Sequence, residues 1–413
     1  MRAIETMLQL RLDAVRDRTD GEVASYIPAL SEMDPDLLGA AIGGARGRIA
    51  SAGDDEAVFT IQSVSKPFIL AQALEEFGRE HVLRVVGVEP SGEPFNAISL
   101  EPGTGRPANP MQNAGAIATT GLMADAFGTD GVITALERFA GRALEVDERV
   151  YASERATGHR NRALGHLLRS YEVIDGDVDA AVTTYFRQCS VRVTVRDLAV
   201  MATTMAFGGV NPITGARVVS ESVARDVMSI MASCGMYDYS GEWMLRVGVP
   251  AKSGISGAVL ATAPSQFGVA AFSPRLDRHG NSVRAVALLE SLSRGLGMHA
   301  FEQHEGLSEP RIRVREVGDE RVLVIGGQLT FSSVGRVLVM IEEELENGRV
   351  VTVELRRPRR VHPAALEALT CQAQLSPGRV RIVPGSRADQ SRGWGDGELP
   401  VSVSRDERDG VRG

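Results

Sequence analysis

The sequence predicts an α+β protein in two units: a large one over residues 1–303, in which helices surround an antiparallel sheet, and a small α/β one over residues 312–385. The length of 413 residues allows two or three domains. Strand-like runs lie at both ends of the large unit with amphipathic helices between them, which is typical of an α+β architecture. After a polar segment, residues 304–311, the hydrophobic pattern changes, and we interpret this segment as a linker.

The spacing of apolar residues in the large unit predicts both helices and strands. Helices are predicted where apolar residues recur every three to four positions, and strands where short runs are rich in β-branched and aromatic residues. The predicted helices are 3–18, 66–76, 131–144, 163–169, 193–206, 220–231 and 281–299. The predicted strands are 59–62, 243–247, 257–263 and 267–272, the last two joined by a turn at Pro264-Ser265.

The small unit follows the order β-β-α-β-α-β. Its predicted strands are 311–317, 321–329, 350–355 and 380–383, and its predicted helices are 332–346 and 364–371. This order is typical of a small α/β domain. Residues 386–413 are rich in Gly, Ser, Arg and Asp, so we expect a disordered tail.

Charge and cysteine content exclude several classes of protein. The net charge of −8 argues against a nucleic acid or an anionic membrane as the main partner. The longest uncharged run, residues 198–216, contains glycines, an asparagine and a proline, so we interpret it as a buried helix and turn, not a membrane span. Cys189, Cys234 and Cys371 match no metal or redox spacing. We therefore expect a cytoplasmic protein without a metal or redox cofactor.

The basic residues are unusual because almost all of them are arginines. Of 45 basic side chains, only Lys66 and Lys252 are lysines. Arginine stays protonated at neutral pH, whereas a desolvated lysine can lose its proton and act as a base. The two lysines are therefore the first candidates for chemistry that arginine cannot perform.

Both lysines lie in motifs of serine acyl-transfer enzymes. Lys66 ends the segment Ser63-Val64-Ser65-Lys66, where a spacing of three puts Ser63 and Lys66 on one helical face. Lys252 begins Lys252-Ser253-Gly254, ahead of a predicted strand. An S-x-x-K followed by a K-[ST]-G is typical of penicillin-recognising enzymes. Taken singly, the first motif could be a helix cap with a solvated lysine and the second a turn lysine.

Further motifs identify one family within this class. They are Tyr26-Ile27-Pro28, residues 109–117 (NPMQNAGAI), 153–161 (SERATGHRN), 185–190 (YFRQCS), 233–241 (SCGMYDYSG) and 250–255 (PAKSGI). Together, over about residues 20–300, this set closely resembles the serine-dependent glutaminase family. The middle S-D-N or Y-x-N motif of the penicillin-recognising enzymes is missing. The resemblance implies a β-lactamase/transpeptidase-like fold and hydrolysis of L-glutamine to L-glutamate and ammonia.

The resemblance also implies roles for individual residues. Ser63 would be the nucleophile and Lys66 its general base, while the backbone N–H groups of Ser63 and Ile255 would form an oxyanion hole. Tyr237 would pass a proton to the departing ammonia, and Tyr26 would line the pocket beside the nucleophile. The amino-acid head of the substrate would be held by Asn113, Glu154, Asn161 and Tyr185. We expect Lys252 and Gln62 to support this site.

The chemistry of free glutamine fits this set of side chains independently of the family name. Its ammonium needs a carboxylate such as Glu154, and its carboxylate needs neutral or cationic donors such as Asn161. Its side-chain amide needs an activated nucleophile and an acid for a poor leaving group.

The small unit resembles a STAS domain, the fold of anti-sigma-factor antagonists. The resemblance lies in residues 324–331 (VIGGQLTF), the helix that follows, and residues 350–355 (VVTVEL). The phosphorylatable serine loop of that family is replaced by Val361-His362-Pro363-Ala364-Ala365, so we expect no phospho-switch. The cluster Arg356–Arg360 is either a solvated loop or a contact for an anion or a protein.

Two other functions are kept as alternatives. One is a serine β-lactamase or peptidase; the other is a non-catalytic regulatory protein whose STAS-like part carries the function. From the family we also expect a homo-oligomer, a dimer or a tetramer. If the small unit is accessory, deletion of residues 304–413 should leave a folded, active enzyme.

Overall fold

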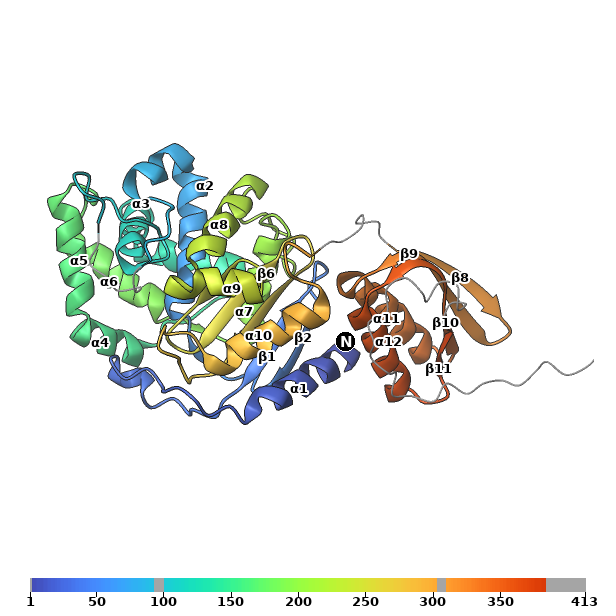
Figure 1. The fold of residues 1–413 in the computed structure, drawn as a ribbon. Coiled ribbons are helices and arrows are strands. Elements are labelled where there is room, and N and C mark those ends of the chain that lie inside the picture. The colour runs from blue at the N-terminus through green and yellow to red at the C-terminus, as the bar shows by residue number, and fades with distance from the viewer. Residues whose placement is uncertain (1, 93–99, 303–309, 384–413) are drawn as a thin grey trace, which may run out of the picture.

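The computed structural model describes residues 2–92, 100–302 and 310–383. It has two units (Figure 1), a large one that mixes a sheet with many helices and a smaller one with a sheet of its own. The predicted α+β class is confirmed. The predicted tail, 386–413, and most of the predicted linker lie outside the described residues.

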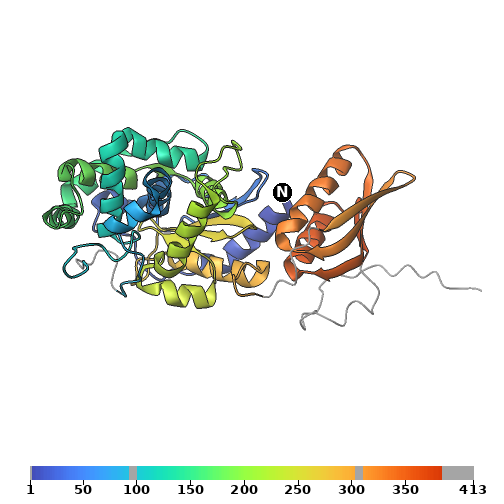
Figure 2. The same ribbon diagram turned by 90° about the horizontal axis from the view of Figure 1, so that it is seen from above.

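The large unit is built on a five-stranded antiparallel sheet with the order β2-β1-β7-β6-β5. Its strands are β1 (Gly39–Gly43), β2 (Ile49–Gly53), β5 (Ala251–Ser253), β6 (Ala258–Ala263) and β7 (Phe267–Phe272). The helices α1 (Arg2–Arg16) and α10 (Val283–Leu296) pack on one face of this sheet, and α7 (Val195–Ala206) packs on the other (Figures 1 and 2). The hairpin of β6 and β7 agrees with the sequence prediction.

The sequence analysis missed β1 and β2 because both are made largely of Gly and Ala, which have low strand propensity. The packing explains the small residues. A Cβ on Gly43 would lie 2.4 Å from Thr203 Oγ1, and one on Gly268 would lie 2.2 Å from the backbone nitrogen of Thr203. The helix α7 therefore approaches the sheet so closely that these positions exclude a side chain.

The remaining long helices of the large unit form a layer beside the sheet. Its helices are α2 (Lys66–Val85), α3 (Asn113–Ala140), α4 (Glu148–Thr157), α5 (His159–Ser170), α6 (Val178–Cys189) and α8 (Glu221–Cys234). The predicted helix 131–144 is only the second half of α3, which is kinked at Gly128 and ends at Gly141 in the left-handed region. The sequence analysis did not predict α4 or α6. The short strands β3 (Phe59–Thr60) and β4 (Arg192–Val193) pair with each other.

The predicted strand 243–247 is wrong. Residues Ser240–Arg246 form a helix, α9. Trp243 and Val247, four positions apart, are both buried, whereas Leu245 between them is exposed, and this is the period of a helix. The bulky apolar residues that suggested a strand thus lie on opposite sides of a short helix.

The small unit has the predicted order of elements. They are β8 (Arg311–Val317), β9 (Glu320–Leu329), α11 (Phe331–Glu346), β10 (Val350–Val361), α12 (Pro363–Leu375) and β11 (Val380–Val383). The strands lie in the order β11-β10-β9-β8, with only the β8–β9 pair antiparallel. The STAS identity stays a prediction. The cluster at 356–360 falls within β10, and its side chains lie outside the described part of the chain.

The two units share an apolar core. The helices of the small unit face α1 and α10 (Figure 2), and one buried cluster includes Met7 of α1, Leu289 of α10 and Leu369 of α12. The ring of Phe331 meets that of Phe267 edge-on, with 5.6 Å between centroids. Arg11 of α1 forms an ion pair with Glu367 of α12 at 3.1 Å. The small unit therefore completes the packing of the first helix of the chain.

We expect Phe331→Ala to lower the free energy of unfolding by about 3 kcal/mol, because it removes a buried ring from this shared core. Phe301→Ala is the matched control, since that ring is 80% exposed. Thermal unfolding should show one shared transition that Phe331→Ala moves. Two independent transitions, of which only one moved, would contradict the shared core. For the same reason a chain without residues 304–413 should be less stable than the full chain.

No helix within the described ranges is long and apolar enough to cross a membrane. Residues 198–216 form most of α7 and the turn after it, as predicted.

Candidate active site

Ser63 and Lys66 lie where β3 leads into α2. Residues Gln62–Ser65 form a 3₁₀ turn, and α2 begins at Lys66, whose backbone N–H donates to the carbonyl of Ser63. Side chains three apart on a 3₁₀ turn lie on the same face. The two side chains therefore share a face, although the α-helix starts at the lysine and not at the serine.

Lys66 is almost completely buried, with 1% of its side chain exposed. Its Nζ donates to the carbonyl of Met111 at 3.1 Å and to Asn113 Oδ1 at 2.7 Å. Burial lowers the pKa of Lys66 to about 7. A neutral lysine has two N–H groups, and these two acceptors use both of them. Its lone pair therefore points elsewhere and can accept a proton.

Asn113 connects this lysine to two other helices. It is the first residue of α3, and its Oδ1 also accepts a hydrogen bond from Tyr185 of α6, at 3.3 Å. Its Nδ2 donates to Asn161 Oδ1 of α5 at 3.0 Å. Because the oxygen of Asn161 is used in this way, its amide NH₂ is the group left to bind an anion.

Glu154 of α4 is a buried carboxyl group, 4% exposed. Gln62 Nε2 donates to Glu154 Oε1 at 2.7 Å and to Thr60 Oγ1 at 3.1 Å. Burial raises the pKa of Glu154 to about 8, against the opposing effect of the hydrogen bond from Gln62. Gln62 itself has a φ of +50°, an unfavourable value for a residue other than glycine. Its side-chain hydrogen bonds stabilise this backbone conformation next to Ser63.

The edge strand β5 brings a third group of residues to the same place. A Cβ on Gly254 would lie 3.1 Å from Val64 Cγ2 and 3.2 Å from the carbonyl of Ile61, so the end of β5 lies against the turn that carries Ser63. Tyr237 is hydrogen-bonded to Ser63, and its hydroxyl donates to the carbonyl of Ser253 at 3.0 Å. Burial raises the pKa of Tyr237 to about 12. Ile255 follows Gly254 and is buried.

Tyr26 is the exposed member of the predicted set. Partial burial raises the pKa of its phenol, with smaller contributions from Tyr237 and Glu154, although 54% of the residue is exposed. The other predicted side chains are buried, apart from Asn161, which is half-buried. The hydrogen bonds and close contacts above place most of the predicted side chains around the turn of Ser63, between the helices α2 to α6 and the end of β5.

The sequence analysis missed Cys189 as a member of this site. It lies one helical turn after Tyr185 on α6, its thiol is hydrogen-bonded to the phenol of Tyr185, and Glu154 and Lys66 are close enough to affect the pKa of the thiol. Burial raises the pKa of the thiol well above its ordinary value, so the thiol is neutral. The spacing of four from Tyr185 is the one signal in the sequence that could have found it.

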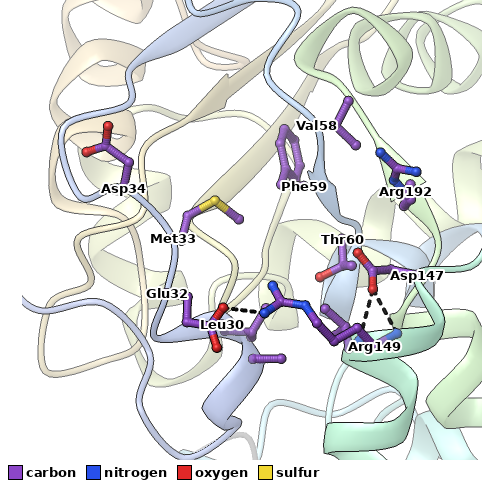
Figure 3. Close-up of a pocket in the computed structure, with 12 residues that line it drawn as sticks. Leu30, Glu32, Met33, Asp34, Val58, Phe59, Thr60, Asp147, Arg149 and Arg192 are labelled. Carbon is purple, nitrogen blue, oxygen red and sulfur yellow. Dashed lines mark hydrogen bonds and ion pairs between the residues drawn. The ribbon is translucent and has the colours of Figure 1, made fainter.

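A cavity of about 270 Å³ lies beside this site, on the outer side of β3 (Figure 3). Glu32 and Arg149 form an ion pair at its wall, and Asp147 caps α4 through the backbone N–H of Arg149. Thr60 lines the cavity and also binds Gln62 of the site. Within the described residues, no three His, Cys, Asp or Glu side chains are grouped as a metal site would require.

Comparison with known proteins agrees with this geometry. The sequence profile of the glutaminase family matches residues 21–301, about two thirds of the chain. The chain belongs to the glutaminase family. It is thus an enzyme of that family, and the match includes every one of the predicted site positions.

Three relatives illustrate the relationship. Glutaminase 2 of Bradyrhizobium diazoefficiens is 44% identical over 378 residues, which are 86% of this chain and 60% of the relative. The glutaminase of Trichormus variabilis is 49% identical over 286 residues, which are 68% of this chain and 86% of the relative. The crystal structure of Mglu in its glutamate form is 36% identical, has a TM-score of 0.71, and aligns over 93% of this chain and 98% of Mglu.

The extent of these alignments indicates which relatives have a counterpart of the small unit. The alignment with Mglu extends over almost all of both chains, whereas the alignment with the Trichormus glutaminase has about the length of the large unit alone. Members of the family therefore differ in what accompanies the catalytic part.

Proposed function

We propose that the protein hydrolyses L-glutamine to L-glutamate and ammonia through an acyl-enzyme on Ser63. The observation that carries this proposal is the buried Lys66 beside Ser63. Its pKa of about 7 provides a neutral amine at physiological pH, which is what a serine hydroxyl needs to become a nucleophile. Family membership and the glutamate-bound relative support glutamine as the substrate.

In the acylation step, Ser63 Oγ forms a bond to the amide carbon of glutamine while its proton passes to Lys66 Nζ. The C–N bond breaks, and the leaving nitrogen takes the phenolic proton of Tyr237 and departs as ammonia. The extra proton on Lys66 returns to the phenolate, so both side chains regain their starting charge. Water then repeats the attack, giving its proton to Lys66, and Ser63 regains a proton as the ester breaks.

The oxyanion that forms during both attacks needs donors fixed in advance. We propose that the backbone N–H groups of Ser63 and Ile255 supply them. The close packing of Gly254 against Val64 supports this pairing, because it holds the end of β5 next to the turn of Ser63.

The amino-acid head of the substrate is bound, in this proposal, by the polar groups on α3 to α6. Glu154 receives the ammonium, and the amide NH₂ of Asn161 receives the carboxylate. Asn113 and Tyr185 complete the set, and Asn113 also fixes Lys66 through its Oδ1. Substrate recognition and the general base are thereby held by one hydrogen-bonded group.

We further propose that the small unit is an accessory, regulatory or partner-binding part and that the reaction is carried out by the large unit. Every residue of the proposed mechanism lies between Tyr26 and Ile255, which supports this division. The homo-oligomer and the cytoplasmic location remain predictions from the sequence.

The decisive experiment measures ammonia release from L-glutamine by the full chain and adds hydroxylamine as a competing nucleophile. An acyl-enzyme would be diverted to γ-glutamyl hydroxamate at the expense of glutamate. Ser63→Ala is the control and should give neither product. Glutamate release that hydroxylamine cannot divert would contradict the acyl-enzyme, and hydrolysis of a chromogenic β-lactam without ammonia release from glutamine would contradict the substrate.

A further inference from the structure

The second lysine, Lys252, is completely buried in β5. Its Nζ donates to the carbonyl of Ser253 at 2.7 Å and to that of Gly235 at 3.0 Å. It also lies 3.9 Å from the centroid of the Tyr237 ring. These three neighbours are all electron-rich, so they match the three N–H groups of an ammonium.

The residues that Lys252 contacts all belong to the surroundings of one phenol. Gly235 lies two residues before Tyr237, in the turn that carries it. A Cβ on Gly235 would come 1.7 Å from the carbonyl of Ala251, so this turn is packed directly onto β5. The carbonyl of Ser253 accepts from both Lys252 and the hydroxyl of Tyr237. Lys252 therefore binds the backbone before the tyrosine, the face of its ring and the acceptor of its hydroxyl.

Tyr237 needs such support because its backbone is strained. Its φ is +59°, in the left-handed region that favours glycine. Such a conformation is unfavourable for a residue other than glycine and persists only where neighbouring groups enforce it. The contacts of Lys252 are three of the interactions that do so.

We propose that Lys252 is the positioning residue of Tyr237, and that its ammonium, against the ring face, stabilises the negative charge on the phenol when Tyr237 gives up its proton. This inference rests on the proposed function, in which that proton goes to the departing ammonia. The step is the one balanced above: the O–H bond of Tyr237 breaks, an N–H bond of ammonia forms, and Lys66 later returns a proton to the phenolate. Lys252 itself exchanges no proton.

The geometry explains why the two lysines would differ in charge. Each lysine donates to two oxygen acceptors, but only Lys252 is also recorded against the face of an aromatic ring, a contact that favours an ammonium. Burial lowers the pKa of Lys252 well below its ordinary value, and the charge of Lys66 lowers it further, so the proposed ammonium depends on its close contacts and on a neutral Lys66. A positive charge at Lys252 would in turn favour the neutral, basic form of Lys66.

The test uses leaving groups that differ in their need for a proton. Ammonia must be protonated as it leaves glutamine, whereas the thiolate of an L-glutamate γ-thioester leaves without a proton. Lys252→Met removes the charge and keeps the length of the side chain. We expect it to lower kcat for glutamine about 10- to 100-fold, less than the roughly 10²- to 10⁴-fold that general acid catalysis contributes because the acid itself remains, with KM changed less than about twofold. Turnover of the thioester should fall less than about threefold.

A second set of measurements uses Tyr237→Phe, alone and combined with Lys252→Met. Tyr237→Phe alone should show the same selective loss on glutamine, and Lys252→Met added to it should cost less than about threefold more, because both changes remove one function. Equal losses on the two substrates, or additive losses in the double variant, would overturn the proposal. Absence of glutamine turnover by the unaltered chain would instead contradict the proposed function.

Folding is checked by thermal unfolding of each variant. If Lys252→Met does not fold, Lys252→Gln, which keeps N–H donors for the two carbonyls but no charge, is measured in its place with the same two substrates. If neither variant folds, Lys252 supports the fold as a whole and not the phenol in particular, and the proposal is overturned.

Discussion

Lys66→Arg is expected to lower kcat at least about 10³-fold, because arginine cannot give up its proton near neutral pH and so cannot accept one from Ser63. The burial of Lys66 is what allows it to act as a base. The pKa of Lys66 is lowered to about 7, so the wild-type amine is available as a base under physiological conditions. A guanidinium in the same place keeps a positive charge and hydrogen-bond donors but has no lone pair to offer. Ammonia release from L-glutamine is the measurement.

Lys66→Met controls for the size and charge of arginine in a buried position, since methionine is uncharged and similar in length. Both variants should fold, as judged by thermal unfolding, and both should be inactive. Lys66→Ala adds a positive test, because a small primary amine in the solvent should restore part of the activity in its unprotonated form. An active Lys66→Arg enzyme, or no rescue by any amine, would contradict the role of Lys66 as the base.

The sequence was sufficient to name candidate site residues that lie close together in the structure because their motifs are chemically distinctive. Ser63 and Lys66 are close in the chain, so a local turn alone puts them together. The β6–β7 hairpin and the element order of the small unit also follow from local patterns of hydrophobicity. These features depend on short-range structure, which composition and spacing describe well.

The contacts between distant segments could not be predicted in the same way. Asn113 was expected to bind substrate, but its hydrogen bond to Lys66 depends on how α3 packs against α2. The left-handed backbone of Gln62 has no signal in a sequence that lacks glycine there. The strands β1 and β2 were missed because glycine and alanine have low strand propensity; close packing requires such residues there, as at Gly43 against Thr203 of α7 and at Gly53 against the carbonyl of Leu38.

The scarcity of lysine has a different explanation at each of its two positions. At Lys66 the requirement is a group that can lose a proton. At Lys252 the proposed requirement is a compact cation in a space enclosed by two carbonyls and a ring. Arginine would meet neither requirement, since its planar guanidinium is larger and directs its donors in one plane.

Glu154→Gln is expected to raise KM for L-glutamine about 30- to 150-fold, which corresponds to the loss of about 2–3 kcal/mol from a buried interaction with the substrate ammonium. The neutral amide keeps the size of the side chain and can still bind Gln62, so the fold should be unaffected. Once substrate is bound, kcat should change much less. An unchanged KM would remove Glu154 from the substrate site.

The pH dependence of kcat/KM distinguishes this role from a structural one, because kcat/KM reports the ionisation of the free enzyme. Burial raises the pKa of Glu154 to about 8 and lowers that of Lys66 to about 7, and both groups must be unprotonated before glutamine can bind and react. As the pH falls below 7, both become protonated, so log kcat/KM of the wild type should approach a slope of 2. Glu154→Gln removes one of the two ionisations. Its slope should fall to 1, with the remaining transition near pH 7, and a variant that kept the slope of 2 would show that the second proton belongs to another group.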